Sequence, residues 1–502
     1  MPQSLWNRGF IALLITQFTV AFNDNAFRWL LVPIGKEYVN EDIIRFLGAV
    51  FLVVPFILWA SIAGYVTDRF NRRNTVIWCK TIELVLLAAA IGVICLGPTI
   101  AESTSIAEAS GSSVPVKVII LLTILFLLGS QAAFFSPSKY GLIPDLVPET
   151  SISAANGIIA MLTMVACVSG QIVGGYVFFW TTLYENKVPT DIPGGHHIWI
   201  TALALVGMAA VGLASCFFIP KMNAVDPLAK FPVRPFRQIG KDLAALFSYR
   251  ALFWVALASA FYWGIAALAQ NNIDKYASEY LMVQQQHVTL LAAVLIIGIG
   301  VGAVLCGYLS GRRIEMGLVP IGAFFMGFFI LILGFTPAHA GTVGRGFGNP
   351  LDTPYIFGAT IMVLAGLGAG LYDIPLAAYL QKKSPTAQRG RMIAAYNFCT
   401  FSAMLLFTGL GLLGAVIFGK LGMTGGEASL MIWIATGLMT LAVAALLFRV
   451  YAAQFYIFFF RSLVKILYRP KFIGIENVPA EGPALLVCNH ISLLDGFLLY
   501  FA

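Results

Sequence analysis

Long apolar runs recur along the whole chain and constrain its fold more than any other feature. The first, at residues 10–31, is long enough to cross the roughly 30 Å hydrocarbon core of a bilayer as a helix. Similar runs lie near residues 46–66, 75–96, 116–135, 153–179, 198–219, 251–270, 288–309, 318–336, 355–374, 393–418 and 429–448. Only 11% of the residues are charged, against about 25% in soluble domains. The sequence therefore predicts an all-α membrane protein with twelve transmembrane helices.

The basic residues between these runs predict the orientation. With the N-terminus in the cytoplasm, most of the 31 Lys and Arg residues fall in cytoplasmic segments, as the positive-inside rule requires. Both termini are then cytoplasmic. The net charge of +8 is explained by basic loops facing anionic lipid, so we expect no nucleic-acid partner. We also expect no metal and no cofactor, because no two cysteines have metal-ligand spacing.

The two halves of the chain resemble each other. Gly64-Tyr-Val-Thr-Asp-Arg69 returns as Gly307-Tyr-Leu-Ser-Gly-Arg312, and Pro137 and Pro148, expected after helix 4, are matched by Pro375 and Pro385 after helix 10. This spacing indicates a duplicated six-helix unit. We therefore predict two pseudo-symmetric bundles at residues 1–220 and 251–450, joined by a cytoplasmic linker at 221–250.

The stretch from Gly64 to Arg73 resembles the signature G-x-x-x-D-R-x-G-R-R of the major facilitator superfamily, with Asn71 at the second glycine. Gly64 permits close helix packing, and Asp68 can hold an Arg or a helix N-terminus in one gate state and release it in the other. In the second copy Gly311 replaces the acid, so that any corresponding electrostatic contact there is weakened or absent. We assign gating to the following residues: Gly64, Asp68, Arg69, Arg72, Arg73, Gly307 and Arg312.

Ionisable residues inside the apolar runs indicate a site, because each is costly in a membrane unless paired or hydrated. Asp24 and Arg28 lie four residues apart on helix 1, so they either neutralise each other or form part of a substrate or ion site. Glu83, beside Lys80, is expected to be a packing or gate contact. In the major facilitator fold helices 1, 4, 7 and 10 line the central cavity. The resemblance then implies a substrate site formed by Asp24, Asn25, Arg28, Gln131, Gln270, Asn271, Tyr372 and Asp373.

Two segments of the sequence indicate a particular branch of this superfamily. Asn23-Asp24-Asn25-Ala26 and the run from Gly129 to Glu149 are similar to the bacterial lysophospholipid transporters of this superfamily, over about residues 1–450. The resemblance implies inward transport of lysophospholipids, chiefly lysophosphatidylethanolamine, across the bacterial inner membrane. A zwitterionic head group needs a cation near its phosphate and an anion near its ammonium, which Arg28 and either Asp24 or Asp373 provide.

The last fifty residues differ in character. An aromatic and basic stretch at 456–469 predicts an interfacial helix. A short apolar strand then precedes Asn489-His490-Ile-Ser492-Leu-Leu-Asp495, which resembles the first block, N-H-x-S-x-x-D, of glycerophospholipid acyltransferases. In that family His490 would deprotonate the acceptor hydroxyl and Asp495 would orient the imidazole. Residues 451–502 are thus expected to hold an interfacial helix and the beginning of an α/β acyltransferase domain, whose other blocks would follow Ala502.

Together these features predict a lysophospholipid flippase with a fused or adjacent acyltransferase that re-acylates its cargo, with an acyl donor protein or acyl-CoA as acyl donor. Two alternatives remain at this point. One is a proton-coupled exporter of amphipathic compounds. The other is an acyltransferase that uses the helices only as a membrane anchor.

Overall fold

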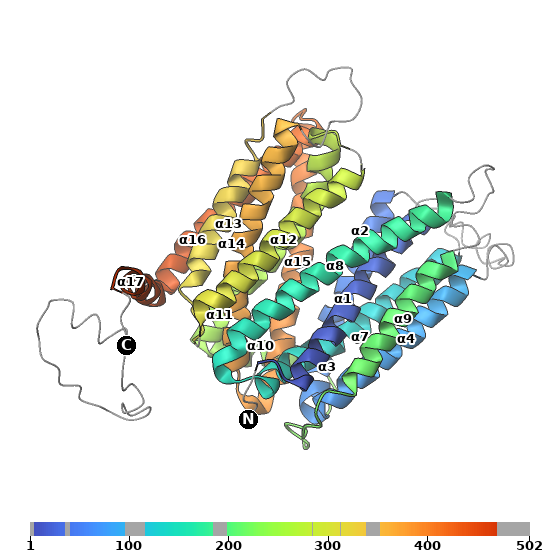
Figure 1. Ribbon diagram of the computed structural model, residues 1–502, viewed down its shortest axis with the longest axis vertical. Coiled ribbons are helices and arrows are strands. Elements are labelled where there is room, and N and C mark those ends of the chain that lie inside the picture. Colours follow the sequence, from blue (N-terminus) through green and yellow to red (C-terminus); the bar gives the residue numbers. More distant parts are fainter. Residues whose placement is uncertain are drawn as a thin grey trace, which may run out of the picture.

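The computed structural model describes residues 5–35, 41–95, 116–183, 198–283, 285–311, 313–337 and 352–468. The described residues form helices arranged in two bundles (Figure 1). The N-terminal bundle contains α1 (Arg8–Gly35), α2 (Glu41–Leu58), α3 (Ala60–Arg69), α4 (Arg72–Cys95), α7 (Val116–Leu146), α8 (Ile152–Leu183) and α9 (Ile198–Cys216). The C-terminal bundle contains α11 (Arg250–Lys275), α12 (Gln285–Ser310), α13 (Leu318–Leu333), α14 (Thr353–Lys383), α15 (Arg389–Lys420) and α16 (Gly425–Val450).

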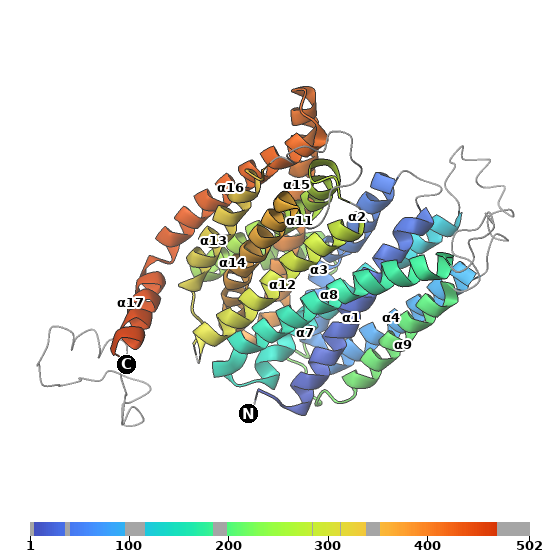
Figure 2. The same ribbon diagram turned by 45° about the horizontal axis from the view of Figure 1, so that its top comes forward.

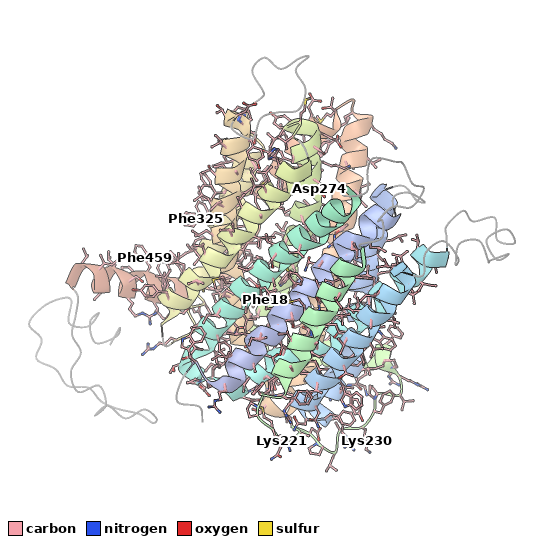
Figure 3. All side chains as sticks on the ribbon, turned by 45° about the vertical axis from the view of Figure 1, so that its right-hand side comes forward. Phe18, Lys221, Lys230, Asp274, Phe325 and Phe459 are labelled. Atoms are coloured by element: carbon pink, nitrogen blue, oxygen red, sulfur yellow. The ribbon has the colours of Figure 1, made fainter. Side chains whose placement is uncertain are left out.

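Two amphipathic helices lie outside the bundles proper. Helix α10 (Pro235–Ser248) is part of the linker, and α17 (Ala452–Tyr468) follows α16. The N-terminus, α10 and the linker residues Lys221 and Lys230 lie at one end of the molecule, here called the linker end (Figures 1 and 3). Asp274 lies at the opposite end (Figure 3).

Within the described residues, nine helices are long and apolar enough to cross a membrane, and ten if α2 and α3 count as one bent span. Helices α9 and α13 contribute shorter apolar segments, Leu203–Cys216 and Leu318–Leu333. Each bundle buries its own apolar core. This is the arrangement expected when lipid covers the outer faces.

Helix 2 differs from the prediction of one continuous run at 46–66. The chain bends by 60° between Val50–Leu58 and Ala60–Arg69. Pro55 has no N–H to donate to the preceding turn, which weakens the helix just before the bend. The indole of Trp59 donates a hydrogen bond to Ser130 Oγ at 3.0 Å, which fixes the bend against α7.

The prolines of the repeat also lie elsewhere than predicted. Pro137 and Pro375 are inside α7 and α14, not after helices, because both helices continue through polar residues past the end of their apolar runs. Each of these helices is followed by a proline and a short 3-10 turn, Glu149–Ser151 in the first half and Thr386–Gln388 in the second. The two halves therefore repeat this local geometry.

The bundles contact each other mainly through α8 of the first bundle and α15 of the second. Helix α8 packs against α12, and α15 packs against α3 and α2. At the α8–α12 contact, a Cβ added to Gly157 would lie 2.6 Å from the carbonyl oxygen of Ala303. The backbones there approach as closely as glycine allows.

Candidate functional site

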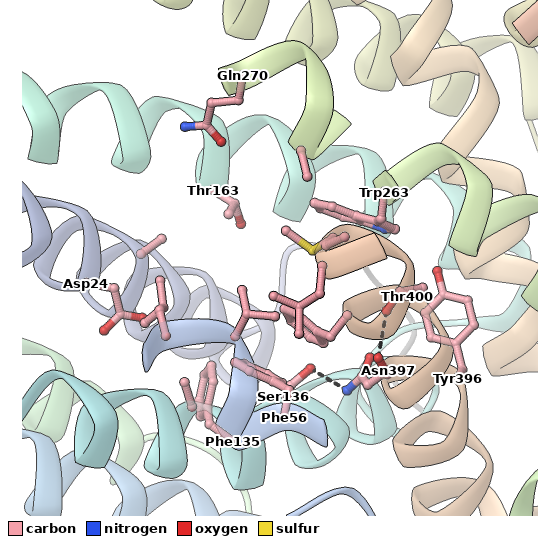
Figure 4. Close-up of a pocket in the computed structure, with 18 of the residues that line it drawn as sticks. Asp24, Phe56, Phe135, Ser136, Thr163, Trp263, Gln270, Tyr396, Asn397 and Thr400 are labelled. Carbon is pink, nitrogen blue, oxygen red and sulfur yellow. Dashed lines mark hydrogen bonds between the residues drawn. The ribbon is translucent and has the colours of Figure 1, made fainter. Parts of the chain in front are cut away.

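A cavity of about 650 Å³ lies between the two bundles. Its walls come from α1, α2, α7 and α8 on one side and from α11, α14 and α15 on the other. Asp24 and Phe135 lie on the N-terminal side of the open space, opposite Trp263, Gln270 and Tyr396 (Figure 4). A volume of this size is typical of sites for small organic molecules.

Most of the substrate residues expected from the sequence line this cavity. They are Asp24, Asn25 and Arg28 on α1, Gln270 and Asn271 on α11, and Asp373 on α14. Asn25 donates to Ala21 O at 2.8 Å and contacts Cys167 Sγ at 3.2 Å. Asn271 likewise donates to Ala267 O, at 3.0 Å. The structure thus brings together polar side chains that lie some 250 to 350 residues apart in the sequence.

Two expected residues are placed elsewhere. Gln131 is buried behind the wall formed by α7, and the hydroxyl of Tyr372 donates to Ala258 O at 2.9 Å, which ties α14 to α11. The reason is helical phase: Gln131 precedes the lining residue Ala132, and Tyr372 precedes Asp373, each by about 100° around its helix. Neither side chain lines the cavity, so the prediction of their position was wrong.

The structure adds a cation that the sequence analysis did not single out. Lys139 lines the cavity from α7, and its Nζ lies 4.2 Å from the ring centroid of Tyr140 and 5.9 Å from that of Phe135. Among the described residues no carboxylate forms an ion pair with it. The cation is held by aromatic faces and remains available to an anionic ligand.

Neutral polar groups form the deeper part of the cavity. Gln381 and Asn156 exchange two hydrogen bonds across the bundles, at 2.8 and 2.9 Å, and Asn397 donates to Ser136 Oγ at 3.0 Å. Gln17 Nε2 donates to Thr163 Oγ1 at 2.9 Å. The Gln381–Asn156 and Asn397–Ser136 contacts join the two bundles beneath the charged part of the cavity, toward the linker end, whereas Gln17–Thr163 joins α1 to α8 within the N-terminal bundle.

Three oxygen atoms on the cavity wall lack a hydrogen-bond donor among the described residues. Asp24 Oδ1, Asp373 Oδ1 and Gln17 Oε1 are buried and have no hydrogen-bond partner among the described residues. A buried acceptor without a partner costs about 1–3 kcal/mol, so such atoms require an explanation. The formal charges on the cavity wall cancel, because two acids, Asp24 and Asp373, are matched by two bases, Arg28 and Lys139. The arrangement suits a ligand that carries both a positive and a negative group.

Glu83 has a different environment from the cavity acids. Both of its oxygens lie 2.7 Å from Lys80 Nζ, and both side chains are fully buried inside the N-terminal bundle. Asn23 Nδ2 also donates to Glu83, at 2.9 Å, and Lys80 donates to Thr19 Oγ1 at 3.3 Å. This cluster joins α4 to α1 directly behind Asp24, which agrees with the packing role expected of Glu83.

The predicted gate residues gather at the linker end, where the bundles meet. Asp68 accepts hydrogen bonds from the backbone N–H groups of Gly390 and Arg391, at 2.8 and 3.0 Å, at the N-terminus of α15. A carboxylate is favoured there because the N–H groups are free and the helix dipole is positive. A Cβ added to Gly64 would lie 2.9 Å from Arg391 Cα, so glycine permits this approach.

Other gate residues extend the contact. Arg72 donates to Asp145 at 2.6 Å and to Gly141 O at 2.9 Å, and Asp145 also pairs with Arg389 of the other bundle at 3.5 Å. Arg73 donates to Phe217 O at 3.1 Å. No bond from the Arg69 side chain to the other bundle is found within the described part of the chain.

The second copy of the motif has a different geometry. Gly307 packs against Ala154, and Gly311 has φ +55°, a conformation that favours glycine at a helix end. An acid at this position would be strained, which explains its replacement. Arg312 lies outside the described residues, as do His490 and Asp495.

A cavity with charged side chains in a largely apolar lining lies between two helical bundles, which contact each other at one end. This arrangement defines a multi-pass membrane transporter. The family model of the Major Facilitator Superfamily matches residues 13–408, and the chain belongs to that superfamily.

The chain is also similar to curated transporters. It is 23% identical over 413 residues to the lysophospholipid transporter LplT of Photorhabdus laumondii, covering 81% of this chain and 89% of the relative. It is 24% identical over 421 residues to LplT of Salmonella gallinarum, covering 82% and 90%.

Solved structures show the same fold. A bacterial homologue of the iron transporter ferroportin, in an outward-facing state, superposes with a TM-score of 0.61 at 15% identity, covering 87% of this chain and 98% of that one. The transporter FucP, in an outward conformation, gives 0.63 at 12% identity with the same coverage.

Proposed function

We propose that this protein moves lysophospholipids, chiefly lysophosphatidylethanolamine, across the bacterial inner membrane toward the cytoplasmic leaflet. The observation that carries the proposal is the cavity between the bundles. It has balanced charges, and buried oxygens of Asp24 and Asp373 lack hydrogen-bond partners. The relatives that are named lysophospholipid transporters support the same substrate class.

The head group fits the cavity by charge. Arg28 and Lys139 receive the phosphate, while Asp24 and Asp373 receive the ammonium group. Lys139 is near Phe135 and Tyr140, and the aliphatic and aromatic lining that includes Phe56 and Trp263 accommodates the start of the acyl chain. A zwitterion offers a group of each sign to the two acids and the two bases of this wall, whereas a simple anion or cation offers only one.

The proposed topology has twelve spans. The bent pair α2 and α3 forms one span, and α9 and α13 complete the two sets of six. With both termini cytoplasmic, the linker end faces the cytoplasm. The lining residues Gln270, Asn271 and Leu412, toward the other end, are exposed, while Gln381 and Asn397 near the linker end are buried. The cavity is then open outward, ready to receive lysolipid from the outer side.

Transport in proteoliposomes tests this proposal. Asp24→Asn keeps the size of the side chain but removes the charge that binds the ammonium group, so labelled lysophosphatidylethanolamine should be flipped at least about tenfold more slowly. Glu427→Gln is the matched control, because Glu427 is an exposed carboxylate that caps α16 far from the cavity. Its rate should equal that of the wild type.

The outcomes separate the rival functions. Equal rates for Asp24→Ala, Arg28→Ala and the wild type would exclude the proposed site. A proton-coupled exporter would be favoured instead by two results together. Transport would require an imposed proton gradient, and other amphipathic compounds would abolish it by competition.

We further propose that the C-terminal segment belongs to an acyltransferase that re-acylates the delivered lysolipid. The support is the block from Asn489 to Asp495, in which His490 is the base and Asp495 its orienting partner. An acyltransferase joined to the transporter acts on its substrate at high effective concentration, with an acyl carrier protein or acyl-CoA as donor. If a chain lacking residues 451–502 still flips lysolipid, the helices are not merely an anchor.

A further inference from the structure

Helix α17 leaves the bundle sideways. It begins two residues after α16 ends and turns away from the axis of that helix, so that it projects from the outer side of the C-terminal bundle near its linker end (Figures 1 and 2). Phe459 on α17 and Phe325 on α13 both lie on this outer side (Figure 3). The position of α17 in the fold is thus at the edge of the molecule, beside the end of a spanning bundle.

One face of α17 holds it to the protein. The backbone at Gln454 and the Cβ of Phe458 pack so closely on Gly317 that a Cβ there would lie 2.6 and 2.9 Å from them. Arg461, one turn further on, forms an ion pair with the buried Glu315. Residues 454, 458 and 461 share one helical stripe that faces the bundle, and Arg461 makes the polar side-chain contact within it.

The opposite face is apolar and uncovered among the described residues. Its large side chains are Tyr456, Phe459, Phe460, Leu463, Ile466 and Leu467, which are exposed from 38% at Phe460 to 72% at Ile466. A helix at a protein–water boundary normally turns its apolar face to the protein and its polar face outward. Here Phe458 and the buried Val464 face the bundle, yet a larger apolar face points outward. This outward face requires an apolar environment on the outer side of α17.

The neighbouring helices indicate which environment this is. Phe324, Phe325 and Phe328 of α13 are exposed on the outside of a bundle that spans the membrane, so lipid covers them. Helix α17 packs at Gly317, the residue that caps the start of α13. Its apolar face therefore continues the lipid-facing surface of α13 at the level where that helix leaves the hydrocarbon.

We propose that α17 lies in the head-group layer of the leaflet at the linker end, with its aromatic face turned toward the acyl chains. Tyr and Phe side chains and flanking Arg residues are typical of helices at this depth. The Arg461–Glu315 ion pair and the contact with Gly317 fix the helix to the bundle, so that the end of α17 lies at the membrane surface. This inference does not depend on which molecule is transported.

Fluorescence quenching tests the proposal on the full chain in vesicles of phosphatidylethanolamine and phosphatidylglycerol. A cysteine introduced as Phe459→Cys carries a bimane label, and the parent protein, labelled in parallel, corrects for the native cysteines. Val233→Cys is the matched control, because Val233 is an 86% exposed apolar residue of the linker. The quenchers are acyl-brominated lipids and aqueous iodide.

Brominated lipid should quench the label at residue 459 several-fold more than the label at 233, and iodide should give the reverse order. Equal quenching of both labels by iodide would overturn the proposal, because α17 would then lie in water. Protection of residue 459 from both quenchers would also overturn it, since a second copy or another protein segment would then cover this face. If Phe459→Cys does not fold, Leu463→Cys on the same face gives the same test.

Discussion

The buried charges of this protein fall into two groups that differ in how they are satisfied. Lys80 and Glu83 have no exposure and bind each other, with Asn23 and Thr19 as further partners. Asp24 and Asp373 line the cavity with oxygens that lack partners. A satisfied buried pair specifies packing, whereas an unsatisfied acceptor beside an open cavity is suited to a ligand. This difference separates the structural residues Lys80 and Glu83 from the candidate functional residues Asp24 and Asp373.

The Lys80–Glu83 pair makes a prediction about stability. Lys80→Met leaves Glu83 buried without its cation, which should lower the free energy of unfolding by about 3–5 kcal/mol. The double variant Lys80→Met, Glu83→Gln should recover part of this loss because no buried charge remains unpaired. Lys382→Met is the control, since the Lys382–Glu149 pair is exposed and should contribute at most about 1 kcal/mol. Thermal unfolding in detergent measures all three, and equal losses for Lys80→Met and Lys382→Met would contradict the prediction.

The sequence was sufficient to find three of the four charged residues on the cavity wall but not the fourth, Lys139. Asp24, Arg28 and Asp373 stand out because each is an ionised residue within an apolar run. Lys139 and Gln381 were missed because the runs predicted for their helices end at 135 and 374, which places both in loops. The spacing of Ala132, Phe135, Ser136 and Lys139 continues one helical face past the apolar run. That periodicity could have revealed the lysine.

Among the helices, apolar length predicted where the spans lie but not how they bend or end. The break at Trp59 depends on Pro55 and on the contact of Trp59 with Ser130 of another helix. The extension of α14 through Pro375 to Lys383 accompanies its packing against α12 and α13 of the same bundle. Both features arise from tertiary contacts, which hydrophobic periodicity does not contain.

The contact between α8 and α12 should be sensitive to the size of one residue. Gly157→Val places a Cβ within 2.6 Å of the Ala303 carbonyl oxygen, and a backbone atom cannot move aside as a side chain can. The two helices must separate, so both transport rate and thermal stability should fall. Gly207→Val on α9 is the control, because nothing lies within 4 Å of its added Cβ. Equal transport and unfolding midpoints for the two variants would show that α8 and α12 are not closely packed in the membrane.

The two bundles are held together asymmetrically. At the linker end, charged contacts cross between them: Asp68 with the N-terminus of α15, Asp145 with Arg389, and Glu149 with Lys382. The linker helix α10 adds another, because Asp242 binds Arg391 of α15. Away from this end the cavity separates the bundles. Alternating access requires these contacts to break when the linker end opens, so their strength sets the balance between the two states.

The pair of Asp242 and Arg391 tests this balance because it belongs to the linker and not to the repeated motif. Asp242 is nearly buried and also accepts from Gln238 at 2.8 Å, while Arg391 is partly exposed and can be solvated when it loses its partner. Asp242→Asn should therefore destabilise the closed linker end by about 1 kcal/mol after screening, which is roughly a fivefold shift toward opening.

Spin labels at the exposed positions Asn74 and Thr386, one on each bundle, report the change as a larger population of long distances. Asp226→Asn is the control, because the Asp226 carboxylate accepts from Leu228 of its own segment. High salt should shift the wild type in the same direction, since it weakens every charged contact at this end. If the distance distribution is unchanged, or if Asp226→Asn changes it equally, α10 does not help to hold the linker end closed.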